Sequence, residues 1–233
     1  MIPAEAIAEN LENVRRRIAA AALRAGRTPD SVTLVAVTKT VDVGEVRALW
    51  ELGVRDFAES RVQELQRKQA ALWDVPVRWH MIGHLQRNKA AKVVRGVELI
   101  HSLDNVRLAM ELENIAAKQG GPVLRALFEV NVSGEATKGG FRPEEVFDAL
   151  RQLAGCPHLR VEGLMTMAPY ADDPQAARPF FAALRRLRDA VPADLPPNVA
   201  LRRLSMGMSN DFEVAIEEGA DLVRVGTALF VRR

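Results

Sequence analysis

The sequence predicts an α/β protein and, within that class, a single (β/α)8 TIM-type barrel. Strand patterns alternate with helical patterns along most of the chain, and this alternation is typical of parallel strands joined by right-handed crossovers. The strand patterns number eight in 233 residues, close to the roughly 250 residues usual for such a barrel. An open, doubly wound parallel sheet is the alternative, because alternation alone does not show that a sheet closes.

The first element is an extra N-terminal helix that precedes the alternation. Five apolar residues recur at steps of three and four and share one helical face, namely Ile7, Leu11, Val14, Ile18 and Ala21. Gly26 is expected to end this helix. The strand patterns cover residues 32–39, 55–59, 77–83, 98–103, 124–132, 160–167, 202–207 and 222–226. The helical patterns cover residues 44–53, 60–72, 87–95, 105–119, 143–154, 174–190 and 210–218.

The composition is that of one globular domain spanning residues 1–233, since no linker or low-complexity tract divides the chain. Hydrophobic residues at 48% and charged residues at 27% exclude disorder. The formal net charge of +2 gives no reason to expect a nucleic-acid partner. The single cysteine, Cys156, fits the reducing cytoplasm, and no apolar run approaches the ~20 residues of a membrane span. The N-terminus lacks the layout of a signal peptide.

Chemistry in such a fold lies at the carboxyl ends of the strands, and Lys39 is the lysine predicted there. Lys68 and three other lysines fall in helical patterns, where a solvated charge is expected, and Lys138 falls in a loop. Lys39 ends a nearly all-apolar strand, where an unpaired ammonium is costly to bury. It is therefore a candidate imine-forming nucleophile, because a neutral amine attacks carbonyl carbon. The alternative is that Lys39 reaches a nearby carboxylate from the strand end.

The loops after the last two strands are candidates for a phosphate site. Ser209 or Asn210 precedes a helical pattern, and Asn210 with Glu213 resembles a capping box. Gly226 and Thr227 follow the last strand, and in barrels these two loops commonly cradle a phosphate. The simpler interpretation is that Ser209 only caps and Gly226 only turns. Together with a strand-end lysine, however, they suit a phosphorylated aldehyde or ketone.

Arg224 alternates with apolar neighbours, so its side chain is expected on the opposite face from theirs, either at the interior mouth of the barrel or in a surface salt bridge. His80 and His84 lack carboxylates and cysteines at metal-ligand spacing. We therefore expect structural or loop hydrogen bonds from the two histidines, and no metal.

Six ordered motifs, from residue 36 onward, carry a resemblance to a known family. They are residues 36–39, 79–89, 130–139, 163–167, 204–209 and 223–228. With them the sequence resembles the pyridoxal-phosphate homeostasis protein family, also described as alanine-racemase-like or as proline synthase co-transcribed proteins. Two departures stand out. Where the family usually has Gly-Glu-Asn, this chain has Ala58-Glu59-Ser60, and Val231 replaces the glycine of a common Phe-Gly pair.

The resemblance implies a barrel like the N-terminal domain of alanine racemase, with pyridoxal 5′-phosphate (PLP) bound to Lys39 as an internal aldimine. By matching position, Ser209, Gly226 and Thr227 hold the phosphate and Arg224 faces the pyridine nitrogen. Ser60 stands at the position of a further cofactor contact. A cation at the pyridine nitrogen disfavours its protonation and weakens the ring as an electron sink.

The resemblance further implies a carrier or reservoir in vitamin B6 homeostasis, without dedicated turnover. Racemases of this fold add a β domain that supplies a tyrosine, and the sequence given holds no such domain. We expect a monomer whose candidate partners are PLP and apo PLP-dependent enzymes. Two alternatives stay open: a small PLP-dependent racemase or transaminating enzyme using Tyr170 or a histidine, and a Schiff-base aldolase acting on a sugar phosphate.

Overall fold

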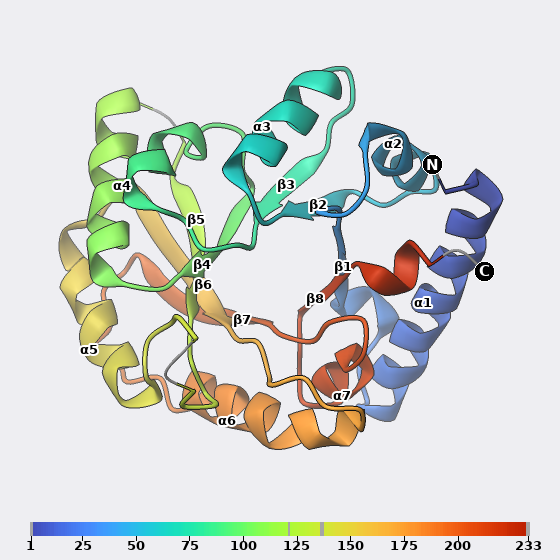
Figure 1. The fold of residues 1–233 in the computed structure, drawn as a ribbon. Coiled ribbons are helices and arrows are strands. Elements are labelled where there is room, and N and C mark those ends of the chain that lie inside the picture. Colours follow the sequence, from blue (N-terminus) through green and yellow to red (C-terminus); the bar gives the residue numbers. More distant parts are fainter. Residues whose placement is uncertain (1, 121, 136–137, 232–233) are drawn as a thin grey trace.

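Eight parallel strands close into a barrel in sequence order, from β1 to β8, in the computed structural model (Figure 1). The structure describes residues 2–120, 122–135 and 138–231, and the rest of the predicted 1–233 unit lies outside the described residues. β1 pairs with both of its barrel neighbours, because Ala36 lies opposite Phe57 of β2 and opposite Val225 of β8. The predicted closure is confirmed, and the open sheet is wrong.

The strands match the predicted order, and most are shorter than their patterns. They are β1 (Thr33–Val37), β2 (Asp56–Glu59), β3 (Arg78–Met81), β4 (Leu99–Leu103), β5 (Leu124–Glu129), β6 (Leu159–Met165), β7 (Val199–Ser205) and β8 (Leu222–Val225). β7 begins three residues before its pattern, directly after the Pro-rich connection that ends at Pro197. The carboxyl ends of all eight strands therefore meet at one mouth.

The α-helices surround the strands (Figure 1). They are α1 (Ala4–Arg24), α2 (Val43–Glu51), α3 (Val62–Ala71), α4 (Val106–Gln119), α5 (Val146–Arg151), α6 (Arg178–Asp189) and α7 (Phe212–Glu217). The predicted helix at 87–95 is wrong, because Arg87–Lys92 form a 3-10 helix with one buried residue, Ala90. The predicted helices at 143–154 and 174–190 begin with 3-10 turns, at Pro143 and Pro174. No helix in the described part of the chain is long and apolar enough to cross a membrane.

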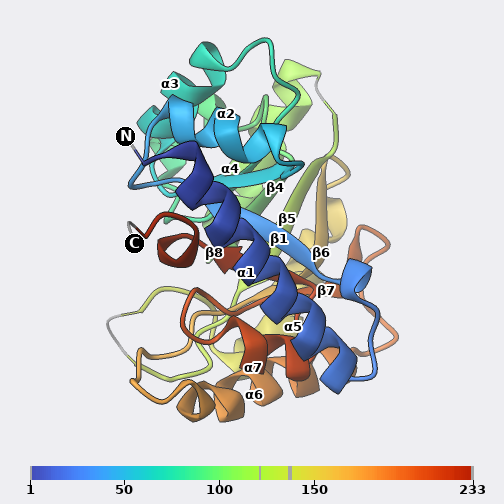
Figure 2. The ribbon, with the colours of Figure 1, turned by 90° about the vertical axis from the view of Figure 1, so that its right-hand side faces the viewer.

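The N-terminal helix α1 completes the outer ring beside β1 and β8, where only a 3-10 turn at Thr227–Leu229 follows β8 among the described residues (Figure 2). Its predicted apolar face is buried. Asn10 on the same face donates from Nδ2 to the carbonyl oxygens of Leu229 and Val231, at 3.2 and 3.0 Å. These hydrogen bonds hold the segment that follows β8 against α1.

The strands are buried on both faces, which explains their nearly continuous apolar patterns. One core lies between the strands and the helices. A smaller cluster fills the barrel interior with Val35, Val37, Ala58, Leu99, Leu127, Met165 and Leu222. Because side chains alternate along a strand, His101 and Arg224, two positions after Leu99 and Leu222, also point inward. His80 and Ser205 are hydrogen-bonded to His101 and therefore lie in the interior as well.

Gly163 is expected to be required for the approach of β6 to β7. A Cβ at this position would overlap the carbonyl oxygen of Arg203 on β7. Gly163→Ala should therefore lower the free energy of unfolding by about 3 kcal/mol, the upper part of the usual range for overpacking. Urea unfolding followed by circular dichroism measures this. Gly155→Ala is the control, since no atom lies within 4 Å of its added Cβ. Equal midpoints for the two variants would contradict the expectation.

Candidate functional site

Lys39 lies at the mouth of the barrel, in the turn that follows β1. The buried Thr38 extends the pairing of β1 with β2, because its backbone N–H donates to the Ala58 carbonyl at 3.0 Å. The Val41 N–H donates to the Thr38 carbonyl and closes the turn that contains Lys39. Lys39 is exposed, because the chain leaves the barrel at Thr38. The expectation that its ammonium group is shielded from water is therefore wrong. No ion pair joins Lys39 to a carboxylate of the described residues. The amine is accordingly open to a ligand in the mouth.

A buried ion pair lies directly beneath this turn. Lys68 on α3 is 1% exposed and donates from Nζ to Glu59 Oε1 at 2.5 Å and to the Thr38 carbonyl at 2.6 Å. The Thr38 hydroxyl also donates to Glu59 Oε1, at 2.7 Å. The expectation that Lys68 is solvated is therefore wrong. Its place after Val62 and Leu65, at steps of three on the buried face of α3, is the signal that identifies it.

The predicted phosphate-site residues lie in the loops after β7 and β8. The Ser209 hydroxyl oxygen accepts the backbone N–H groups of Gly226 and Ala228, each at 3.2 Å. The predicted capping role of Ser209 and Asn210 is wrong, since α7 starts at Phe212 with Asp211 before it. These two N–H groups occupy the lone pairs of the Ser209 oxygen, so the hydroxyl proton can be donated to a ligand.

Gly226 brings this loop against the end of β1. A Cβ on Gly226 would lie 3.1 Å from the Val37 carbonyl oxygen, and Val37 is two residues before Lys39. Thr227 follows and is exposed, while Ser60 is half-buried at the end of β2. A Cβ on Gly83 would overlap the Ser60 carbonyl, so the end of β3 packs closely on Ser60. The predicted site residues Lys39, Ser60, Ser209, Gly226 and Thr227 therefore gather at one end of the barrel.

Arg224 lies inside the barrel, below this loop, and is 4% exposed. It donates from Nη1 to Ser205 Oγ at 2.6 Å and from Nη2 to the Thr166 carbonyl at 2.9 Å. Burial lowers the pKa of Arg224 to about 10, against the opposing effect of the Glu129 and Asp211 carboxylates. A guanidinium has five N–H donors, so these two bonds leave donors for a ligand in the mouth.

Glu129 at the end of β5 is a site residue that the sequence analysis missed. Burial and the negative charge of Asp104 raise the pKa of Glu129 to about 7, although Arg224 and His84 act in the opposite direction. His84 itself pairs with Asp104, with Nδ1 2.7 Å from Oδ2. The pattern in the sequence that could have identified Glu129 is a carboxylate at the end of a mostly apolar strand. Its side chain can hold or release a proton near neutral pH.

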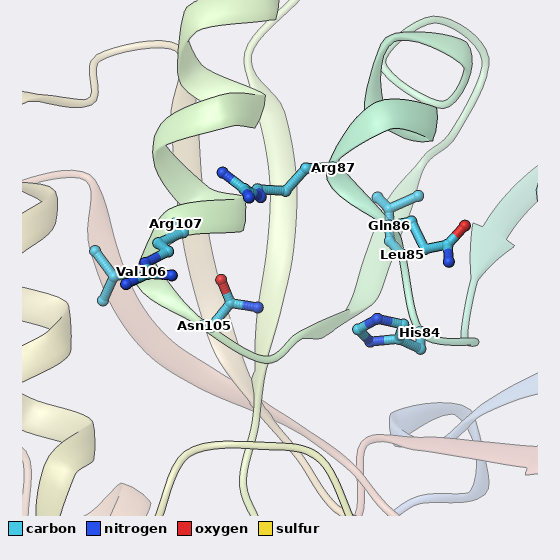
Figure 3. Close-up of a pocket in the computed structure, with 7 residues that line it drawn as sticks. All are labelled: His84, Leu85, Gln86, Arg87, Asn105, Val106 and Arg107. Atoms are coloured by element: carbon cyan, nitrogen blue, oxygen red, sulfur yellow. The ribbon is translucent and has the colours of Figure 1, made fainter.

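A cavity of about 640 Å³ opens beside the ends of β3 and β4, lined by residues 84–87 and 105–107 (Figure 3). Arg87 and Arg107 approach it from opposite sides, and Lys39 and Ser209 are not part of its lining. The structure therefore has open space at this rim of the mouth, beyond the ends of β3 and β4.

The fold and the arrangement of these residues define an alanine racemase-type barrel. A family model described as "Alanine racemase, N-terminal domain" matches residues 2–233. The structure of alanine racemase from Clostridium difficile superposes with a TM-score of 0.76 at 15% identity, covering 100% of this chain and 58% of that one. At this identity the likeness concerns the fold alone.

The chain belongs to the pyridoxal phosphate homeostasis protein family. It is 46% identical over 225 residues to the pyridoxal phosphate homeostasis protein of Aquifex aeolicus, with 97% of both chains covered. The corresponding protein of Escherichia coli is 36% identical, again with 97% of both covered. PipY of Synechococcus elongatus, solved with PLP bound, has a TM-score of 0.81 at 35% identity and covers 97% of this chain and 100% of that one.

Lys68→Ala is expected to lower the free energy of unfolding by about 3–5 kcal/mol, because it leaves the buried Glu59 carboxylate without its cation. Chemical denaturation measures the loss. Lys118→Ala, in the exposed last turn of α4, serves as the control and should change stability by less than about 0.5 kcal/mol. Replacing both partners, as Lys68→Met with Glu59→Leu, should recover most of the loss. A Lys68→Ala variant as stable as the control would argue against a paired buried charge.

Proposed function

We propose that this protein binds PLP in the barrel mouth through Lys39 and acts in vitamin B6 homeostasis as a carrier or reservoir. The observation that supports this most directly is the contact between Gly226 and the end of β1, which sets the Ser209 loop beside the Lys39 turn. A primary amine next to an anion cradle suits a phosphorylated aldehyde. PipY, a solved relative, has PLP bound, and relatives carry the name pyridoxal phosphate homeostasis protein.

Each site residue has a distinct role in this proposal. The Lys39 amine would hold the aldehyde carbon, and the Ser209 hydroxyl together with the Gly226 and Thr227 loop would hold the phosphate. Arg224 would donate toward the pyridine nitrogen, and Ser60 would border the ring. Bound PLP supplies an electron sink, and a cation at its nitrogen weakens that property. This chemistry favours storage over turnover.

The exposure of Tyr170 supports a carrier in place of an enzyme. A two-base racemase needs a second positioned proton carrier, and Tyr170, the only tyrosine, is 80% exposed. Glu129 is the observation that favours the alternative, a small PLP-dependent enzyme, because its carboxyl has a pKa of about 7. We further propose that the protein is a cytoplasmic monomer of one domain and that apo PLP-dependent enzymes receive the cofactor.

The first test is the visible spectrum of the purified protein. The wild type should be yellow, and borohydride should fix a pyridoxyl group on Lys39, located by peptide mass mapping. Lys39→Ala should lose the band, while the control Lys118→Ala should keep it. A colourless protein that borohydride labels only with a sugar phosphate would instead support an aldolase. Sustained racemisation of added alanine, reduced in Glu129→Gln, would support an enzyme.

Ser209→Ala should weaken binding of PLP by about 10–100-fold, as expected for a hydrogen bond to a charged group. The affinity for pyridoxal, which lacks the phosphate, should change by less than about threefold. Calorimetric titration of both vitamers measures the difference. Ser31→Ala is the control, because Ser31 is exposed in the turn that precedes β1, at the end opposite the mouth. Equal losses for the two vitamers would refute a phosphate role.

A further inference from the structure

A chain of hydrogen bonds crosses the barrel interior from Arg224 to the opposite end. From Ser205 Oγ, which accepts from Arg224, the chain passes to His101 Nδ1 at 2.8 Å. His101 Nε2 lies 2.8 Å from His80 Nδ1, and His80 Nε2 lies 3.1 Å from Asp56 Oδ1. The three members between Arg224 and Asp56 are shielded from water, because Ser205 and His101 are 0% exposed and His80 is 2% exposed.

The far end of the chain is an ion pair. Arg78, with a half-exposed side chain, donates to both oxygens of Asp56 at 2.9 and 2.6 Å. Burial alone would raise the pKa of Asp56, but the hydrogen bonds from His80 and Arg78 prevail and lower it to about 2. The carboxylate is therefore ionised and only accepts. It follows that His80 carries a proton on Nε2.

From this anchor, one order of bonds gives every donor of the chain an acceptor within it. Burial lowers the pKa of His101 well below its usual value, so its ring is neutral and has one donor and one acceptor. In that order His80 Nδ1 accepts from His101 Nε2–H, and His101 Nδ1 accepts the Ser205 hydroxyl proton. In the reverse order His101 Nδ1–H donates to Ser205, and the Ser205 proton has no acceptor within the chain.

We propose that Ser205 and His101 are positioning residues that hold the Arg224 guanidinium toward the cofactor ring. Since the Ser205 proton is committed to His101, its oxygen presents only lone pairs to Arg224. The Thr166 carbonyl accepts from the other Nη, and these two acceptors set the plane of the guanidinium. The inference rests on the proposed function, in which Arg224 meets the pyridine nitrogen, and adds residues on β4 and β7 that do not touch the cofactor.

The apo protein offers the first test, without any substitution. Long-range ¹H–¹⁵N spectra of the full chain should show both His80 and His101 with the proton on Nε2. The exposed His84 and the half-buried His158 serve as internal references. A proton on Nδ1 of His101 would overturn the inference, because Ser205 would then no longer be directed at Arg224 alone.

The second test is the absorption spectrum and affinity of the PLP-loaded protein. His101→Phe, which cannot accept from Ser205, should shift the visible band and raise the dissociation constant of PLP about tenfold, the size expected for one weakened hydrogen bond to a charged group. His101→Gln should restore both values, since its amide can accept from Ser205 and donate to His80. His158→Gln, on the outer surface beside Glu113, is the matched control.

The outcomes separate this inference from the proposed function. A wild-type band that stays unchanged in His101→Phe overturns the inference alone. Absence of a band in the wild type overturns the proposed function and the inference with it. If His101→Phe does not fold, Ser205→Ala replaces it, and the same shift and loss of affinity are expected because Arg224 then lacks an acceptor. A shift in His101→Phe that His101→Gln does not reverse would indicate a packing effect and overturn the positioning role.

Discussion

The site depends on one contact, the pairing of the last strand with the first. Because β8 pairs with β1, the Gly226 loop from the end of the chain lies against Val37, near its beginning. The close approach needs a residue without a Cβ, since an added carbon would lie 3.1 Å from the Val37 carbonyl. Ser209 then binds the same loop through two backbone N–H groups. An amine and an anion cradle that are distant in sequence become neighbours only through barrel closure.

Two buried polar networks support this mouth from below. Lys68 donates to the Thr38 carbonyl that precedes Lys39 and pairs with Glu59, and Ser205, linked to the two interior histidines, accepts from Arg224. Burying such groups is favourable only when nearly every donor and acceptor has a partner. In the described part of the chain, Glu59 Oε2 is the atom of these networks that lacks one. The first network therefore restricts the backbone at Thr38, and the second restricts the Arg224 guanidinium. Apolar side chains in the same places would not impose these restrictions.

The sequence was sufficient for what depends on local periodicity and not for what depends on contacts across the barrel. Apolar strand patterns predicted the barrel, and period-two alternation offered the interior as one of two places for Arg224. The predicted helix at 87–95 is wrong because Arg87–Lys92 bury only Ala90 and so lack an apolar face that would pack a full α-helix on the barrel. Of the two roles considered for Ser209, the helix cap is wrong, since backbone N–H groups from another loop donate to its oxygen. Lys68 was misread because its partner Glu59 lies on a different element.

The exposure of the site residues decreases from Lys39 to Arg224, and this gradient is relevant to the proposed carrier role. Lys39 is exposed, Ser60 and Gly226 are half-buried, and Arg224 is buried. In the proposed function Arg224 would therefore hold the ring nitrogen inside the barrel, and Lys39 would hold the aldehyde carbon at the open mouth. Enzymes that act on reactive cofactors usually exclude water from this carbon. A site that instead leaves it accessible allows water or another amine to release the cofactor, and release is the step that a reservoir must perform.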